Sequence, residues 1–382
     1  MAKIDDSVKK KVPELRFPGF TDDWEERKAK EMIKTHHFRS YLAEPNDVGN
    51  YEVIQQGDKP IAGYANGEPF EYFYDVTLFG DHTVSLFKPT KPFFIATDGV
   101  KIISADEFDG RYFYVTLERY KPASQGYKRH FTILKNEDIW FTTNKDEQVK
   151  IGTFFKQLDE TIALHQRKLD LLKEQKKGYL QKMFPKNGAK VPELRFAGFA
   201  DDWEERKLGE LGSVAMNKRI FKDQTSEIGD IPFFKIGTFG GEADAYISRK
   251  LYEEYKQKYP YPKVGDILIS ASGSIGRTVV YQGEEEYFQD SNIVWLNHDE
   301  RLNNRFLKQF YSIVTWQGLE GSTIKRLYNK NILETKISIP TPNEQEKIGL
   351  FFEKIDDTID LHQFKLDLLK EQKKGFLQKM FV

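Results

Sequence analysis

Two glycines lie close together in the stretch ASGSIGRT, between the apolar runs GDILIS and RTVVY. Backbone N–H groups around glycines such as Gly273 and Gly276 bind anions in tight turns. The neighbouring Ser272, Ser274 and Arg277 carry donors suited to phosphate oxygens or a guanine edge. The same pattern is typical of a plain turn between two strands. The stretch is therefore a candidate nucleic-acid contact with a purely structural alternative.

A basic dipeptide recurs in otherwise dissimilar surroundings. Lys128-Arg129, in SQGYKRHF, and Lys325-Arg326, in GSTIKRLY, lie at the same distance before a long segment that is repeated in the chain. Arginine binds guanine through two parallel N–H groups, and lysine supplies a point charge for phosphate. Adjacent basic residues are also common on solvated surfaces, so a DNA contact and a bland surface remain alternative interpretations.

Motifs of common enzyme classes do not occur in the sequence. The stretch nearest to a P-loop has Ala and Arg where that motif needs Gly and Lys, and HExxH, GxSxG and an amino-methyltransferase Asp/Asn-Pro-Pro-aromatic tetrapeptide are missing. The chain has no cysteine, which excludes disulfides and Cys nucleophiles. ExK, at 174–176 and 371–373, lies inside predicted helices. We expect no catalytic residue, metal or cofactor in this chain; an enzyme with a dispersed site is the alternative.

Two internal repeats organise the chain. KVPELRFPGFTDDWEERK (11–28) returns at 190–207 with 16 of 18 residues identical. The segment 147–184 returns at 344–381 with 29 of 38 identical, at an offset of 197. The intervening segments share almost no sequence. Such self-similarity indicates a duplication in which the flanks are constant and the centres vary.

The longer repeat has the periodicity of a heptad stripe over 150–184 and 347–381. The stripe includes Leu158, Ile162, His165, Leu169 and Leu172 in the first copy, and Ile355, Ile359, His362, Leu366 and Leu369 in the second. Each helix would be roughly 52 Å long. Gly178, Gly375 and Pro185 mark the predicted helix ends.

Neither helix can bury its stripe alone, so the two are expected to pair with each other. A two-fold relation between the duplicated halves makes the pairing antiparallel and brings His165 near His362. The two imidazoles are interpreted either as a polar layer that fixes register or as a metal-binding or pH-sensing pair.

The variable segments indicate compact α/β domains. In 29–149, runs at 71–79, 83–87, 91–97 and 111–117 predict strands. In 208–346, strands are predicted within 231–239, 263–281 and 292–296, and helices near 248–258 and 303–316.

Bulk charge does not indicate an acidic or basic partner, since 58 Lys and Arg face 59 Asp and Glu. Any DNA-facing surface must then be local, or a partner protein supplies most of the phosphate contacts. No signal-peptide pattern and no run of 18 apolar residues is found, so we expect a cytoplasmic protein that does not contact membranes.

The layout resembles the DNA specificity subunit of bacterial type I restriction-modification systems over essentially the whole chain. The motifs that carry the resemblance are VPELRF-GF-DDWEERKLGE, KVGDILISASGSIGR, and ISIPTPNEQEKI leading into FFEKIDDTIDLHQ. In the first variable segment, VTLFGDHTVSLFKPTKPFFIATDGVKII is similar to a recurring type of target-recognition domain.

The resemblance implies an α+β fold in which two α/β target-recognition domains are separated by an antiparallel coiled coil of two long helices, with a pseudo-two-fold. The first domain would be 1–149 and the second 188–346, and the spacer helices would be 150–187 and 347–382. The chain would read one half of a bipartite double-stranded DNA site with each domain. Its partners would be two methyltransferase subunits and two restriction (motor-nuclease) subunits, which would hold S-adenosylmethionine, ATP and Mg.

The first domain departs from the pattern of the second. Its junction FTTNKDEQVKI lacks IPTP, and it has no GSIGR-type loop. The candidate DNA contacts there are His82, Thr83, Lys88 and Lys91. A different class stays open as well, because the repeats alone would suit a coiled-coil scaffold whose two domains bind proteins.

The two helices offer a direct test of the spacing that the resemblance implies. Deleting seven residues from each, 162–168 and 359–365, keeps the heptad stripe while shortening both helices. We predict a shorter gap between the half-sites methylated in cells that carry this variant with its methyltransferase. Methylome sequencing reads the gap, and an unchanged motif would contradict the prediction.

Overall fold

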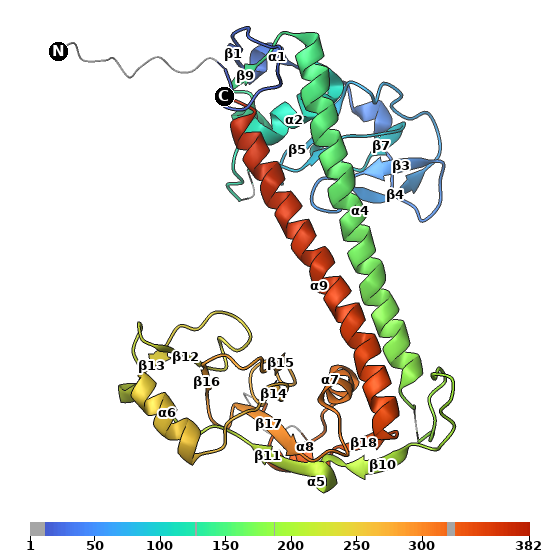
Figure 1. Cartoon of the computed structure of the whole chain (residues 1–382). Coiled ribbons are helices and arrows are strands. Elements are labelled where there is room, and N and C mark those ends of the chain that lie inside the picture. Colours follow the sequence, from blue (N-terminus) through green and yellow to red (C-terminus); the bar gives the residue numbers. More distant parts are fainter. Residues whose placement is uncertain (1–11, 127, 187, 319–324) are drawn as a thin grey trace, which may run out of the picture. The chain divides into compact units, whose positions relative to one another are not determined.

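The computed structural model describes residues 12–126, 128–186, 188–318 and 325–382 (Figure 1). The chain folds as two compact units. Unit 1 comprises Met1–Arg167 with His362–Val382, and unit 2 comprises Lys168–Leu361. Residue 11 of the repeated lead-in and residue 187 of the first predicted spacer lie outside the described residues.

Unit 1 is a mixed α/β body. Its strands are β1 (Glu25–Lys28), β2 (Ile33–Thr35), β3 (Tyr51–Ile54), β4 (Ile61–Ala65), β5 (Thr77–Gly80), β6 (Leu86–Phe87), β7 (Phe93–Ile95), β8 (Val100–Ala105) and β9 (Asp138–Phe141). Its helical elements are α1 (Ala29–Met32), the 3-10 turn η1 (Arg39–Tyr41), α2 (Gly110–Tyr120), α3 (Phe131–Leu134), the first part of α4 (Lys145–Met183) and the last part of α9 (Pro342–Lys379).

Unit 2 contains the corresponding elements. Its strands are β10 (Glu204–Lys207), β11 (Gly212–Ala215), β12 (Ile231–Phe234), β13 (Tyr246–Ile247), β14 (Ile267–Ser270), β15 (Thr278–Val280), β16 (Tyr287–Phe288), β17 (Ile293–His298) and β18 (Lys336–Ile339). Besides the remaining parts of α4 and α9, its helical elements are α5 (Leu208–Leu211), η2 (Lys222–Gln224), α6 (Arg249–Lys258), α7 (Asn304–Ile313) and α8 (Asn329–Glu334).

The sheets of the two units have the same topology. The antiparallel order β2-β8-β5-β6 in unit 1 corresponds to β11-β17-β14-β15 in unit 2. In a second sheet, β3 lies between antiparallel β4 and parallel β7, and β12 lies likewise between β13 and β16. The predicted fold class is confirmed: the chain contains two α/β domains of one topology and two long antiparallel helices.

The strand predicted at 111–117 is wrong, because this run forms part of α2. The carboxylate of Asp109 accepts hydrogen bonds from the N–H groups of Arg111 and Tyr112, at 3.0 and 3.1 Å, and so caps the helix N-terminus. Tyr112 and Phe113 are buried in the core of unit 1. Helix capping and burial override the strand preference of the aromatic residues. The predicted helices near 248–258 and 303–316 are confirmed as α6 and α7.

The long helices begin five residues before the predicted starts at 150 and 347. The side chain of Asn144 caps α4 by accepting the N–H groups of Asp146 and Glu147, at 3.1 and 3.2 Å. The prediction that Gly178 and Gly375 end the helices is wrong, since both lie inside them. Packing of buried residues beyond the glycines, such as Leu180, holds the helix in place.

The helices run antiparallel where they meet in each unit. In unit 1 the rings of Phe154 and Phe376 lie 5.1 Å apart, and in unit 2 those of Tyr179 and Phe351 do so as well. The ten stripe residues given above are buried or half-buried, whereas Tyr179, near the end of the predicted stripe, is exposed. Antiparallel pairing predicts a close approach of His165 and His362, and their Nδ1 atoms lie 3.1 Å apart in unit 1. One imidazole can donate this hydrogen bond to the other, which gives a polar layer within the stripe.

Two lysines on the long helices form ion pairs that follow the duplication. Lys373 contacts Asp159 at 2.7 Å in unit 1, and Lys176 contacts Asp356 at 2.6 Å in unit 2. The offset of 197 that separates the two lysines also separates the two aspartates. Equivalent ion pairs in the two units follow from the duplication of the sequence.

A buried ion pair ties each repeated lead-in to the start of a long helix. Arg16 binds both oxygens of Glu147 at 2.6 and 2.8 Å, and Arg195 binds those of Glu344 at 2.7 Å each. Both glutamates are fully buried. Removing one partner of such a pair costs about 3–5 kcal/mol, because the other charge is left buried. The pairs therefore fix the lead-ins on the helices.

The residue after each glutamate is a buried glutamine that joins three segments. In unit 1, Gln148 accepts the N–H of Asp109 at 2.8 Å and donates to the carbonyl oxygens of Glu107 and Thr142. In unit 2, Gln345 makes the same set of bonds to the N–H of Asn303 and to two carbonyl oxygens. These amides hold α2 and α7 against the long helices.

Glycines within the long helices allow α2 and α7 to approach closely. A Cβ on Gly152 would lie 2.8 Å from the backbone nitrogen of Tyr112, and one on Gly349 would lie 2.6 Å from the Cβ of Arg305. A Cβ on Gly178 or Gly375, in the same two helices, meets no atom within 4 Å. The close approach of α2 and α7 to the long helices therefore requires glycine at 152 and 349 but not at 178 and 375.

We predict opposite effects of alanine at these two pairs of sites. Gly152→Ala and Gly349→Ala should destabilise the protein by about 1–3 kcal/mol through overpacking. Gly178→Ala and Gly375→Ala should stabilise it by ~0.5–1 kcal/mol, because alanine is the better helix former. Thermal unfolding of the four variants measures the difference, and equal stabilisation by all four would refute the crowded crossing.

Candidate nucleic-acid interface

The predicted loop of unit 2 is a hairpin turn between β14 and β15. Gly273 and Gly276 adopt positive φ angles of 64° and 83°, which favour glycine. Inside the turn, the hydroxyl of Ser270 accepts the backbone N–H of Arg277 at 3.0 Å. Ser274 is exposed, and the Arg277 side chain donates to the carbonyl oxygen of Gly240 at 3.0 Å. The turn presents Ser274 and Arg277 at the surface.

The predicted basic dipeptide of unit 2 lies beside this turn. Leu327 N–H donates to the carbonyl oxygen of Ala271 at 2.8 Å, and Arg326 forms a β-bridge with Ser272. The structure therefore brings together all the predicted contact residues of unit 2, which are Ser272, Ser274, Arg277, Lys325 and Arg326. Lys325 is exposed and Arg326 is half-buried.

The basic dipeptide of unit 1 occupies the equivalent position. His130 N–H donates to the carbonyl oxygen of Asp81 at 2.8 Å, as Leu327 does to Ala271. Asp81 and Ala271 each follow the last residue of an equivalent strand, β5 or β14. Lys128-Arg129 therefore correspond in space to Lys325-Arg326, as they do in sequence offset. The two dipeptides therefore occupy equivalent places in the two domains, in addition to their equal distance from the repeated helices.

The first domain brings two of its four other candidates to this place. His82 Nδ1 lies 3.2 Å from the carbonyl oxygen of Lys128, and Thr83 follows in the β5–β6 turn. Lys88 and Lys91 are engaged elsewhere in unit 1. Lys88 donates to the carbonyl oxygens of Tyr74 and Val76, the second at 2.8 Å, and Lys91 binds Glu52 at 2.8 Å. A role of any of these side chains on DNA stays a prediction.

Sequence reasoning missed the residues that hold the candidates in place. In unit 2, Arg326 Nη2 donates to Ser291 and Asn292, which precede β17. In unit 1, the side chain of Gln56 accepts the N–H of His82 at 3.0 Å. These partners are distant in sequence from the residues they hold, and no motif marks them.

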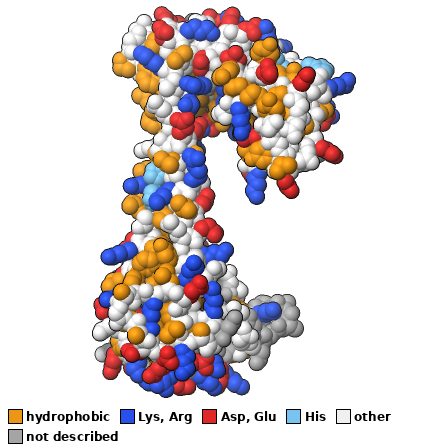
Figure 2. Space-filling view, turned by 90° about the vertical axis from the view of Figure 1, so that its right-hand side faces the viewer, with side chains coloured by type: hydrophobic (Ala, Val, Ile, Leu, Met, Phe, Trp, Pro, Cys, Tyr) orange, Lys and Arg blue, Asp and Glu red, His pale blue; other side chains and the backbone are white. Residues whose placement is uncertain are grey.

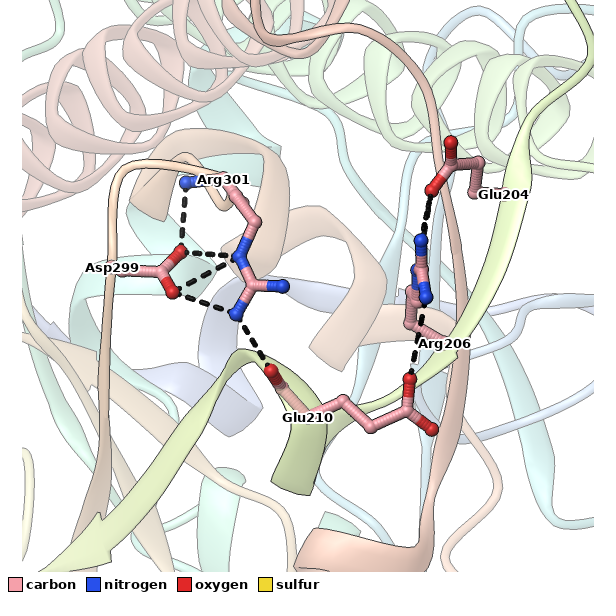
Figure 3. Close-up of polar contacts among 5 residues, drawn as sticks. All are labelled: Glu204, Arg206, Glu210, Asp299 and Arg301. Carbon is pink, nitrogen blue, oxygen red and sulfur yellow. Dashed lines mark hydrogen bonds and ion pairs between the residues drawn. The ribbon is translucent and has the colours of Figure 1, made fainter.

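Many cations on the described surface are already paired with carboxylates. Basic and acidic side chains are interspersed over the face shown in Figure 2. Figure 3 shows a local example in unit 2, in which Arg301 binds Asp299 at 2.7 Å and Arg206 lies between Glu204 and Glu210. The hydrogen bonds from Arg301 lower the pKa of Asp299 to about 2. A nucleic-acid contact made by this chain is therefore local.

Two further features of the described residues bear on the kind of site. Within residues 12–126, 128–186, 188–318 and 325–382, no group of three or more His, Asp or Glu side chains is placed to hold a metal ion. No helix of the same residues is both long and apolar enough to cross a membrane.

The fold and the paired loops define a protein built from two copies of one α/β domain, each followed by a long helix. The family of the type I restriction modification DNA specificity domain matches the chain twice, at residues 21–174 and 200–371. Each match covers one variable segment with most of its repeated helix. The chain belongs to this family.

Two curated relatives share part of the chain. The putative type I restriction enzyme specificity subunit S.HindORF215P of Haemophilus influenzae is 59% identical over 151 residues, which is 39% of this chain and 39% of that relative. The type I restriction enzyme MjaVIII specificity subunit of Methanocaldococcus jannaschii is 22% identical over 249 residues, 61% of this chain and 58% of that relative. The chain thus spans less than two thirds of either relative.

A solved structure has the same fold over nearly the full length. The crystal structure of the type I restriction-modification system S subunit from M. genitalium superposes with a TM-score of 0.65 and 16% sequence identity. The superposition covers 97% of this chain and 99% of that one.

The environment of Lys88 predicts a pH dependence of stability. Burial lowers the pKa of its ammonium group from 10.5 to about 8. Between these pH values the unfolded chain binds more protons at this site than the folded one, so its contribution to stability rises with pH. We predict that the parent protein becomes more stable relative to the Lys88→Met variant from pH 8 to pH 10. The measurement is the difference between their unfolding midpoints at each pH.

Lys91→Met is the matched control for this prediction. The hydrogen bond with Glu52 raises the pKa of Lys91 above 10.5, so this lysine is mostly protonated in both the folded and the unfolded state up to pH 10. Its contribution to stability should therefore fall slightly, and not rise, between pH 8 and pH 10. If the difference in unfolding midpoint for Lys88→Met does not rise between pH 8 and pH 10, burial does not lower the pKa of Lys88.

Proposed function

We propose that this chain is the DNA-reading subunit of a type I restriction-modification complex and that each α/β domain reads one half of a split site. The observation that carries the proposal is the double match to the specificity-domain family, one match for each domain. The two domains share a topology but differ in their loops. Two dissimilar half-sites call for one scaffold with two different reading surfaces.

The paired loops supply the chemistry for reading. Each domain presents a Lys-Arg dipeptide beside the turn that follows a central strand, β5 or β14. Arginine is suited to a guanine edge in the major groove, and lysine to a phosphate oxygen. The turns themselves differ in length and residue type, with DHTVS in unit 1 and ASGSIGR in unit 2. This difference gives each domain its own sequence preference.

The repeated helices are the docking surface that we propose for two copies of one methyltransferase subunit. Leu164 and its copy Leu361 are 60% and 50% exposed, and Leu171 and its copy Leu368 are 53% and 47% exposed. Leucines one heptad apart lie on the same side of a helix, and an exposed apolar surface of this kind is a candidate protein-interaction site. Identical exposed residues in both copies suit identical partners.

Catalysis belongs to those partners in this proposal. The methyltransferase subunits would bind S-adenosylmethionine, and two motor-nuclease subunits would use ATP and Mg. The complex would methylate the cell's own DNA and cut unmodified phage DNA in the cytoplasm. This chain contributes recognition and assembly and no catalytic group. Membership of the specificity-domain family favours this function over a scaffold that binds proteins only.

Methylome sequencing tests the function directly. Cells that carry this chain with its neighbouring methyltransferase are compared with cells that lack only this chain. We expect a bipartite adenine-methylated motif that disappears with the chain. Identical methylation in the two strains would overturn the DNA-reading function and favour the protein-binding scaffold.

The two arginines should each act on one half-site. We predict that Arg129→Ala and Arg326→Ala weaken discrimination by ~1–3 kcal/mol at a base position of the first and the second domain's half-site, respectively. Binding of the assembled complex to singly substituted DNA sites measures the loss. Uniform weakening on all sequences would instead assign the residue to a phosphate.

A further inference from the structure

We propose that Ser291 and Asn292 are positioning residues that preset Arg326 for base reading in the second domain. The inference rests on the proposed function and adds to it. It assigns specificity to two side chains that do not themselves need to touch DNA. It also distinguishes the two domains, since the first domain has Gly99 in place of Asn292.

Asn292 connects the turn to the arginine. Its Oδ1 accepts a hydrogen bond from the hydroxyl of Ser272 at 2.8 Å and another from Arg326 Nη2 at 3.2 Å. Its backbone oxygen accepts the N–H of Ala271 at 2.7 Å. One residue thus couples the β14–β15 turn, the start of β17 and the basic dipeptide. The position of the arginine follows the position of the turn.

Ser291 holds the same nitrogen from a strained backbone. Arg326 Nη2 donates to its carbonyl oxygen at 3.1 Å and to its hydroxyl at 2.9 Å. The φ angle of Ser291 is +52°, a left-handed conformation that among the described non-glycine residues only Val84 shares. Such a conformation persists where surrounding contacts impose it, and it concentrates at functional sites. The bonds to Arg326 are among those contacts.

The bracing leaves part of the guanidinium for a ligand. Nη2 donates all of these bonds, sharing its two N–H groups among three acceptors, and the guanidinium lies 6.0 Å from the ring centroid of Tyr328. Nη1 therefore remains to donate toward a base edge from a fixed plane. A side chain that is ordered before binding loses less conformational entropy on binding, which strengthens a correctly placed contact and weakens a misplaced one.

The first domain supplies a natural comparison. Asp81 N–H donates to the carbonyl oxygen of Gly99 at 2.8 Å, as Ala271 does to Asn292, so Gly99 occupies the position of Asn292. Glycine has no side chain to brace an arginine. Arg129 is exposed and makes no hydrogen bond or ion pair with any described residue. Arg129 is thus unbraced where Arg326 is held.

The test copies the first domain into the second. Asn292→Gly reproduces Gly99, and the full-length variant is expressed with its methyltransferase for methylome sequencing. We expect discrimination at one base position of the second half-site to fall roughly five- to tenfold, within the range that one arginine–guanine contact supplies. Arg326→Lys should relax the same position. The half-site of the first domain is the internal control and should stay unchanged.

Ser291→Gly separates positioning from folding. Glycine accepts φ +52° without strain, so this variant should fold at least as well as the parent while it loses the hydroxyl that binds Arg326. We expect it to relax the same base position by a smaller factor. An unchanged motif in both the Asn292 and Ser291 variants, or equal loss at every position of both half-sites, overturns the inference. If the parent chain produces no chain-dependent motif, the proposed function fails instead.

Discussion

Neither compact unit can form from one contiguous half of the chain. In unit 1 the segment directly after the second helix supplies Phe381, whose ring lies 5.6 Å from that of Trp24 in the first lead-in. In unit 2 the residue directly after the first helix is Phe184, which packs on Trp203 and Phe306 at 6.0 and 5.2 Å. Each core is completed by the helix that belongs to the other repeat. The antiparallel course of α4 and α9 is therefore a condition for both cores.

This condition explains which parts of the duplication have stayed identical. The Arg–Glu pairs, the buried glutamines and the crossing glycines lie where a lead-in, a domain and a long helix meet. A change at one of them leaves a buried polar group unsatisfied or forces backbones together, which costs several kcal/mol. The turns after β5 and β14 are not part of these contacts with the long helices, and residues near their tips, such as Thr83 and Ser274, are exposed. The two turns differ in length and in residue type, while the Arg–Glu pairs, the buried glutamines and the crossing glycines make the same contacts in both units.

The repeats made much of the architecture predictable from the sequence. The offset of 197 places Lys128-Arg129 on Lys325-Arg326, and the stripe brings His165 to His362, because a duplicated fold repeats its contacts. The common topology of the variable segments was not visible, since it is carried by backbone hydrogen bonds that many sequences can make. The run 111–117 was mistaken for a strand because the cap at Asp109 outweighs its aromatic composition.

Contacts between distant loops were the part that sequence reasoning could not reach. The bond from Arg326 to Ser291 crosses 35 residues of chain and depends on an unusual backbone angle at the serine. Lys88 looks like a free cation in the sequence, but it is half-buried and donates to two carbonyl oxygens. A lysine or arginine in a candidate DNA-binding segment can contact a base only if the fold leaves at least one of its N–H groups unbonded.

The charge distribution assigns attraction and discrimination to different chains of the proposed complex. The net charge is −1, and many surface cations are neutralised by carboxylates, as at Arg206 and Arg301. Attraction to the phosphate backbone grows with the number of unpaired cations and is the same for every sequence. A DNA-binding chain with strong phosphate contacts of its own would be bound mostly at non-specific sites, which greatly outnumber the specific ones. In the proposed complex, a nearly neutral chain with a few placed donors would add discrimination to an attraction provided by its partners, so the same partners could serve two different reading domains.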